Sequence, residues 1–234
     1  MITEPQLTKI RNYLLAKKLP IDILIEVNDH FISQINDLQK EENLSFEEAF
    51  EKVKESWKEE ITPYWKGDWD LENRNRLVRN LEKNIFKEIN KQFLPYLFLL
   101  IFLFFSLSYI VNIEIFKILF ILISSIILLF PLLNLIIKYR DFQIWRKYQN
   151  YILTLYQQYT FLNLSAAYFV FRLVFDGENV AQYLFDFFNN PNFKNLLQGF
   201  LISFILYYVS FITYHSQKIY LSKIQKVKPF LKYL

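Results

Sequence analysis

The sequence contains no cysteine, and only three glycines and two histidines in 234 residues. Without cysteine it offers no disulfide framework, thiolate zinc site or iron–sulfur site. So few glycines also exclude glycine-rich phosphate loops and GxxxG pairing of membrane helices. Both histidines lie outside the long apolar runs, which disfavours an enzyme acting inside a membrane. We therefore expect no cofactor, no metal centre, no catalytic residue and no enzyme activity.

Acidic residues are scarce in the second part of the chain. Residues 93–234 are dominated by Phe, Leu, Ile and Tyr, whereas residues 1–92 hold most of the acids and more than half of the bases. A soluble protein spreads its charge over its whole surface, so this segregation indicates two solvents. The net charge of +4 comes from bases beside apolar runs. We therefore expect an integral membrane protein and no nucleic-acid partner.

Residues 1–61 are predicted to form a cytoplasmic three-helix bundle. Thr3-Glu4-Pro5-Gln6 has the pattern of a capping box, and Leu19-Pro20 ends the first helix and starts the second. Ser45-Phe46-Glu47-Glu48 is a second capping box. Apolar residues at three- and four-residue spacing give each helix one buried face. Residues 62–92 are predicted to be a linker followed by a basic juxtamembrane helix.

Four apolar segments, each of about twenty residues, are long enough to cross a hydrocarbon core of about 30 Å. They are residues 93–113, 115–137, 151–175 and 195–214. The predicted fold is thus all-α, with a small cytoplasmic helical bundle and a four-helix transmembrane bundle over residues 93–215. Between the last two segments, apolar residues from Val180 to Phe188 predict a short amphipathic helix lying in the membrane interface.

Basic residues predict the orientation of the spans. They gather before the first span, between the second and third spans, and in a basic tail over residues 216–234. The positive-inside rule then places both termini in the cytoplasm of a bacterial inner membrane. We expect several of these bases to contact the anionic inner leaflet. They are Arg74, Arg76, Arg79, Lys138, Arg140, Arg146, Lys147, Lys218 and Lys223.

Polar residues form stripes on the third and fourth spans, which we expect to face each other within the bundle. The members taken as candidate polar or ligand-contact residues are Gln158, Ser165, Arg172, Ser203 and Tyr207. They either join helices by hydrogen bonds or line a polar pathway. Arg172 either binds an anionic group or extends to the interface beside Asp176.

Glu26, Asp29 and His30 lie on the second cytoplasmic helix. A metal site would need a further ligand in reach, and none stands out. The alternative is a surface role, and we take these three residues as candidate partner contacts.

The segment from Lys17 to Glu60 resembles the HAAS-type helical prefix domains of bacterial membrane proteins, and especially uncharacterised membrane proteins of the Bacteroidetes. The residues that carry the resemblance are Leu19, Pro20, Glu26, Asp29, His30, Ser45, Glu48, Ala49 and Trp57. The resemblance covers about a quarter of the chain. It implies a cytosolic helical module fused to membrane spans and supplies no catalytic residues.

Two functions from different classes fit this pattern. The first is a non-enzymatic accessory, regulatory or assembly subunit whose cytoplasmic module binds a protein partner. The second is a small oligomeric transporter or channel that uses the polar faces of the third and fourth spans. The spans lack paired acids and broken helices, which favours the first.

Overall fold

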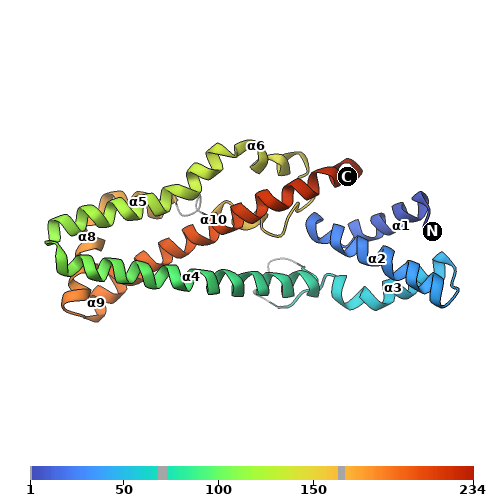
Figure 1. Cartoon of the computed structure of the whole chain (residues 1–234), viewed down its shortest axis with the longest axis horizontal. Helices are drawn as coiled ribbons and strands as arrows, with labels where there is room; N and C mark the ends of the chain where they lie inside the picture. Colours follow the sequence, from blue (N-terminus) through green and yellow to red (C-terminus); the bar gives the residue numbers. More distant parts are fainter. Residues whose placement is uncertain (1, 68–72, 163–166) are drawn as a thin grey trace. The chain divides into compact units, whose positions relative to one another are not determined.

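The computed structural model describes residues 2–67, 73–162 and 167–234, with only the backbone for residues 167–175 (Figure 1). Its regular elements are helices, as the sequence predicts. The chain divides into two compact units. The first unit combines Met1–Phe86, Gln143–Leu155 and Leu221–Leu234, and the second combines Lys87–Phe142 with Tyr156–Tyr220.

Three helices near the N-terminus begin where the sequence predicts. They are α1 (Glu4–Leu15), α2 (Ile21–Glu41) and α3 (Phe46–Ile61). At α1, the Thr3 amide donates to Gln6 Oε1 at 2.8 Å. At α3, the Ser45 hydroxyl accepts from the Glu48 amide, and Glu48 Oε2 accepts from the Ser45 amide. Both predicted capping boxes are therefore confirmed.

The predicted apolar faces of α1–α3 form their common core. Ile10 and Leu14 of α1, Phe31 of α2, and Ala49 and Phe50 of α3 are almost completely buried. Tyr13 packs its ring edge against Phe50 at 5.8 Å between centroids. Burial of each of the larger side chains, Ile10, Leu14, Phe31 and Phe50, stabilises the fold by about 1.5–3 kcal/mol, which holds these short helices together.

Two segments far along the chain also belong to the first unit, which the sequence analysis did not predict. One contains the 3₁₀ turn η1 (Ile144–Lys147) and continues to Leu155. The other is the chain end, with the 3₁₀ helix η4 (Lys228–Tyr233). The chain end buries Ile224, Val227 and Leu231, so residues 216–234 are more than a solvated basic tail. Between the lysines of this segment, Ile224, Val227 and Leu231 recur at three- and four-residue spacing and form one apolar face.

The second unit contains the long apolar helices. They are α4 (Arg76–Ile110), whose first residues lie in the first unit, α5 (Ile113–Ile137) and α10 (Ile202–Val227), whose last residues lie in the first unit. Shorter elements are α6 (Tyr139–Phe142), η2 (Gln157–Tyr159), α8 (Ala167–Asn189), α9 (Phe193–Asn195) and the π-helical η3 (Leu196–Leu201). Among the described residues, Arg76–Ile110, Ile113–Ile137 and Phe193–Tyr233 are long and apolar enough to cross a membrane. The first, second and fourth predicted spans are thus confirmed as such helices.

The predicted third span differs from the structure. Residues 151–156 are not helical, residues 163–166 of the predicted span lie outside the described residues, and α8 spans Ala167–Asn189. Leu153 and Leu155 belong to the first unit and are buried there at 0% and 4% exposure. Their apolar character is therefore satisfied by protein rather than by lipid. A hydropathy pattern does not distinguish these two environments.

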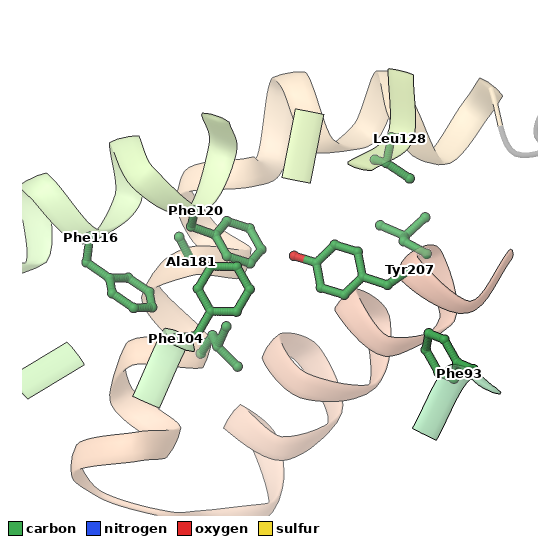
Figure 2. Close-up of a cluster of buried hydrophobic side chains, with 9 residues drawn as sticks. Phe93, Phe104, Phe116, Phe120, Leu128, Ala181 and Tyr207 are labelled. Atoms are coloured by element: carbon green, nitrogen blue, oxygen red, sulfur yellow. The ribbon is translucent and has the colours of Figure 1, made fainter. Parts of the chain in front are cut away.

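The predicted interfacial helix between Val180 and Phe188 is instead the C-terminal half of α8. Ala181 and Leu184 are buried at 0% and 3% exposure in a cluster with side chains from α4, α5 and α10. Figure 2 shows this cluster, with Phe104, Phe116, Phe120 and Tyr207 around Ala181. The apolar face of α8 packs against the other helices. This packing accounts for the helical spacing of the apolar residues from Val180 to Phe188.

Candidate functional site

A line of buried and part-buried hydrogen bonds joins α5 to α10, and we call it the α5–α10 polar interface. It consists of Ser124 and Asn134 on α5 and Tyr207, Ser210 and Gln217 on α10. The Ser124 and Tyr207 hydroxyls lie 2.6 Å apart. Asn134 Nδ2 donates to Gln217 Oε1 at 2.8 Å. Figure 2 shows the Tyr207 hydroxyl pointing into the aromatic cluster.

Pro131 explains why polar side chains of α10 lie beside this part of α5. Proline has no amide hydrogen, so the carbonyl of Ile127, four residues earlier in α5, has no donor within its own helix. The Ser210 hydroxyl donates to this carbonyl at 2.7 Å. Gln217 Nε2 donates to the carbonyl of Pro131 at 3.1 Å. The chain continues as helix through Pro131 because α10 supplies the missing hydrogen bond.

The direction of the helices follows from these pairs. Ser124 lies beside Tyr207 and Pro131 beside Gln217, so α5 and α10 run parallel. On α4, Asn90 accepts from Tyr208, and Phe104 lines the same small cavity as Phe200, so α4 runs antiparallel to α10.

A close backbone contact joins η3 to α8. A Cβ atom placed on Gly199 would lie 2.6 Å from the Leu184 amide nitrogen and 2.8 Å from the Tyr183 carbonyl carbon. Real Cβ atoms do not approach backbone so closely, so only glycine fits between these elements. Ser203, one turn later, donates to the Gly199 carbonyl at 2.8 Å.

The cavity beside this contact is small and mainly apolar. Its volume is about 20 Å³, and its lining includes Phe104, Leu184, Phe200, Ser203 and Tyr207. That volume holds about one water molecule. The arrangement suits helix packing more than the passage of a solute.

The structure brings together only some of the predicted polar residues. Ser203 and Tyr207 lie buried on α10. Gln158 lies exposed on the turn η2. Ser165 lies outside the described residues, and Arg172 lies on α8 with only its backbone described. Tyr207 contacts Ser124 of α5, which the sequence analysis did not predict. Pro131 is the signal in the sequence that α5 needs a hydrogen-bond donor from a neighbouring helix.

In the first unit, the start of α2 binds a segment without regular secondary structure, residues 152–155, and we call this contact the Asp22 junction. The Ile21 and Asp22 amides donate to the carbonyls of Ile152 and Leu153 at 2.8 and 3.2 Å. Asp22 Oδ1 accepts from the Leu155 amide at 3.1 Å. The N-cap residue of α2 is a proline, which offers no side-chain acceptor, so backbone carbonyls cap the helix instead.

The Asp22 junction also includes an ion pair with the C-terminal segment of the chain. Lys223 Nζ lies 3.0 Å from Asp22 Oδ2. Burial raises the pKa of the Asp22 carboxyl, and the Lys223 ammonium and the Leu155 amide oppose part of that rise. Arg11 of α1 lies over the Tyr233 ring at 3.8 Å from its centroid. Three separate chain segments therefore meet in one unit.

The predicted partner-contact residues are accessible. Glu26, Asp29 and His30 are exposed on α2. The His30 ring lies 6.2 Å from the Trp57 ring of α3. Within the described ranges, no group of three or more His, Asp or Glu residues could hold a metal ion.

The predicted lipid-contact bases fall into two groups. Arg74 pairs with Glu82 at 2.6 Å, Arg76 lies 3.4 Å from Glu60, and Lys223 belongs to the Asp22 junction. Arg79 donates to the carbonyl of Tyr64 at 3.0 Å. These four contact protein groups. The others are exposed: Lys138, Arg140, Arg146, Lys147 and Lys218.

In comparisons with known proteins, no family model matches the chain, and no curated protein and no solved structure matches it. The resemblance of the N-terminal module to HAAS-type domains stays a prediction.

Proposed function

We propose that this chain is a non-enzymatic accessory or assembly subunit of a bacterial inner-membrane complex, with α1–α3 as its partner-binding module. The observation that carries the proposal is the composition of the first unit. It joins the N-terminal segment, the connection after α5 and the chain end. These are the three segments that the positive-inside rule assigns to the cytoplasm. A unit built from all three serves as one docking body on that side.

Two contacts in the second unit support four membrane crossings. Gln217 of α10 donates to the carbonyl of Thr160 at 3.1 Å, near the end of α5. Phe188 lies at the opposite end, where its carbonyl accepts from Tyr109. Thr160 and Phe188, the first before α8 and the second near its end, thus lie at opposite ends of the length that α5 covers. Helix α8 has 23 residues, or about 35 Å, which is the length of a crossing, although the three helices of the described residues that also have the apolar composition of a span do not include it.

A crossing by α8 would place acidic side chains at membrane depth. Glu178 precedes Phe188 by 10 residues, about 15 Å along the helix, and is exposed. An acid facing lipid at the centre of a bilayer costs about 2.5–3.5 kcal/mol. Such residues are therefore usually covered by protein or water. A neighbouring subunit would cover Glu178, which supports a role within a complex.

The alternative of a transporter or channel has less support. The buried polar side chains of α5 and α10 bond to each other, as inter-helix contacts do. The cavity among α4, α8 and α10 has the volume of about one water molecule. Exposed bases such as Lys138 and Arg140 contact the anionic inner leaflet in either case.

The test is purification of the tagged chain from its native membrane in a mild detergent, followed by reconstitution into liposomes. We expect a protein partner at fixed stoichiometry and no solute flux from the isolated chain. Flux or catalytic turnover by the chain alone would overturn the proposal. Homogeneous assemblies of this chain without a partner would point to the transporter or channel.

A further inference from the structure

A groove runs between α2 and α3 on the surface of the N-terminal module, and we call it the α2–α3 groove. Its volume is about 350 Å³. Leu38 and Val53 form its apolar floor, and the polar residues around it are Gln34, Asp37, Glu41, Lys52 and Ser56. A groove between two helices accepts the apolar side chains of an amphipathic helix.

The acids on the two walls of the groove, α3 and α2, differ in whether they are paired. Every acid of α3 has a partner: Glu47 pairs with Lys9, Glu51 with Lys54, Glu55 with Lys58, Glu59 and Glu60 with Arg76, and Glu48 serves in the cap of α3. In the part of the chain that the structure describes, Asp37 and Glu41 of α2 have no ion-pair or hydrogen-bond partner. Lys52, the base beside them, pairs with Glu42. The groove therefore carries unneutralised negative charge on its α2 side.

The position of these acids costs stability within the module. Glu41 is the last residue of α2, and Asp37 lies one turn earlier. The C-terminus of a helix carries partial negative charge, which disfavours a carboxylate there. Lys40 lies in the same last turn of α2, but among the described residues neither Asp37 nor Glu41 forms an ion pair with it. Because these two acids disfavour the helix end at which they lie, we expect that they have a role outside the module.

We infer that the α2–α3 groove binds a basic amphipathic helix of a partner protein. Apolar side chains of that helix lie on Leu38 and Val53, and its lysines or arginines pair with Asp37 and Glu41. The exposed acids Glu26 and Asp29 extend the same negative charge along α2. This inference rests on the proposed function, because it names the partner surface of the accessory subunit.

The experiment uses the full chain in nanodiscs of zwitterionic lipid. The probe is a fluorescent amphipathic peptide of lysine and leucine, and its binding is measured by anisotropy against empty nanodiscs. A glutamate–leucine peptide is the charge control. The test variant is Asp37→Asn with Glu41→Gln. The matched control is Glu51→Gln with Glu55→Gln, which removes the same charge from α3.

We expect the test variant to weaken binding of the lysine–leucine peptide about fivefold and to lower its salt dependence. The control variant should bind within about twofold of the original chain. The thermal midpoint of the test variant should be unchanged or higher, because it removes acids from a helix end. If the peptide binds both variants equally weakly, the effect is one of net charge alone and the inference is wrong. It is also wrong if the peptide does not bind the original chain.

The native partner separates this inference from the proposed function. If the test variant loses a partner that the control variant retains in native-membrane purification, the inference holds. If both variants retain the partner, the groove is not its binding site, although the chain is still an accessory subunit. If the original chain has no partner, the proposed function itself fails.

Discussion

The Ser210 hydroxyl donates a hydrogen bond to the carbonyl of Ile127 at 2.7 Å, and these two residues belong to different helices. Pro131 leaves that carbonyl without a donor in α5. One proline therefore determines where α10 must present a polar side chain. The contact links a local defect in one helix to the packing of two.

This relationship predicts a coupling between positions 131 and 210. Ser210→Ala should destabilise the original chain by about 0.6–1.5 kcal/mol, because a buried carbonyl loses its donor. In a Pro131→Ala background the new amide satisfies Ile127, so the same substitution should cost close to nothing. The free energy of unfolding in bicelles, measured for all four combinations, checks this. Equal costs in both backgrounds would refute the explanation.

Gly199→Ala should destabilise the chain by about 1–3 kcal/mol, because its Cβ would overlap the backbone of α8 at Leu184. The same unfolding measurement applies. Leu197→Ala is a control on the same π-helical segment, since that side chain is 40% exposed. If both substitutions have the same small effect, η3 and α8 do not touch at Gly199.

Asp22 should make stability depend on pH in an uncommon direction for an acid. Its pKa is raised in the folded chain, so the native state binds its proton more tightly than the unfolded state. This contribution is full below the unfolded pKa of about 3.9 and is lost as pH rises through the raised folded pKa. Asp22→Asn lacks that titration. Relative to the original chain, the variant should therefore gain stability as pH rises from about 4.

Thermal unfolding of the two proteins across this pH range measures the difference, with Asp29→Asn as an exposed control on the same helix. A local measurement separates charge from hydrogen bonding. Asp22→Asn keeps an oxygen for the Leu155 amide, whereas Asp22→Ala removes it. Hydrogen exchange at Leu155 should be faster only in Asp22→Ala. Equal exchange in both variants would mean that Asp22 does not hold this segment.

The proposed topology predicts a labelling pattern for single cysteines, and the chain has no native cysteine to interfere. Cysteines at exposed Ser33, Gln149 and Lys232 should react with an impermeant maleimide only after cells are opened. Cysteines at exposed Glu114 and Asn190 should react in intact cells. With three crossings, Ser33 and Lys232 would react on opposite sides. That result would contradict four crossings.

The N-terminal module was predictable because its signals are local. A capping box such as Ser45 with Glu48 involves residues three apart, and each apolar face repeats within its own helix. The same holds for α5, whose apolar run is long and uninterrupted. Such features depend on neighbours in sequence, so no knowledge of distant segments is needed.

The first residues of the third predicted span, 151–156, were placed wrongly for the opposite reason. Leu153 and Leu155 look suited to lipid, yet they are buried against protein in the first unit. Tyr207 was identified as a polar contact on the fourth span, but its partner Ser124 lies 83 positions away. A single sequence reports how apolar a segment is and does not report what covers it.

The helical class, the capped N-terminal module and three long apolar helices can be predicted from the sequence alone, because caps and periodicity act within one or two turns. Other contacts are specified only by the tertiary packing: Asp22 with Leu155 and Lys223, Gly199 with Leu184, and Ser210 with the carbonyl of Ile127. These contacts depend on which surfaces meet in space. Buried polar groups then find partners wherever packing brings a donor near an acceptor.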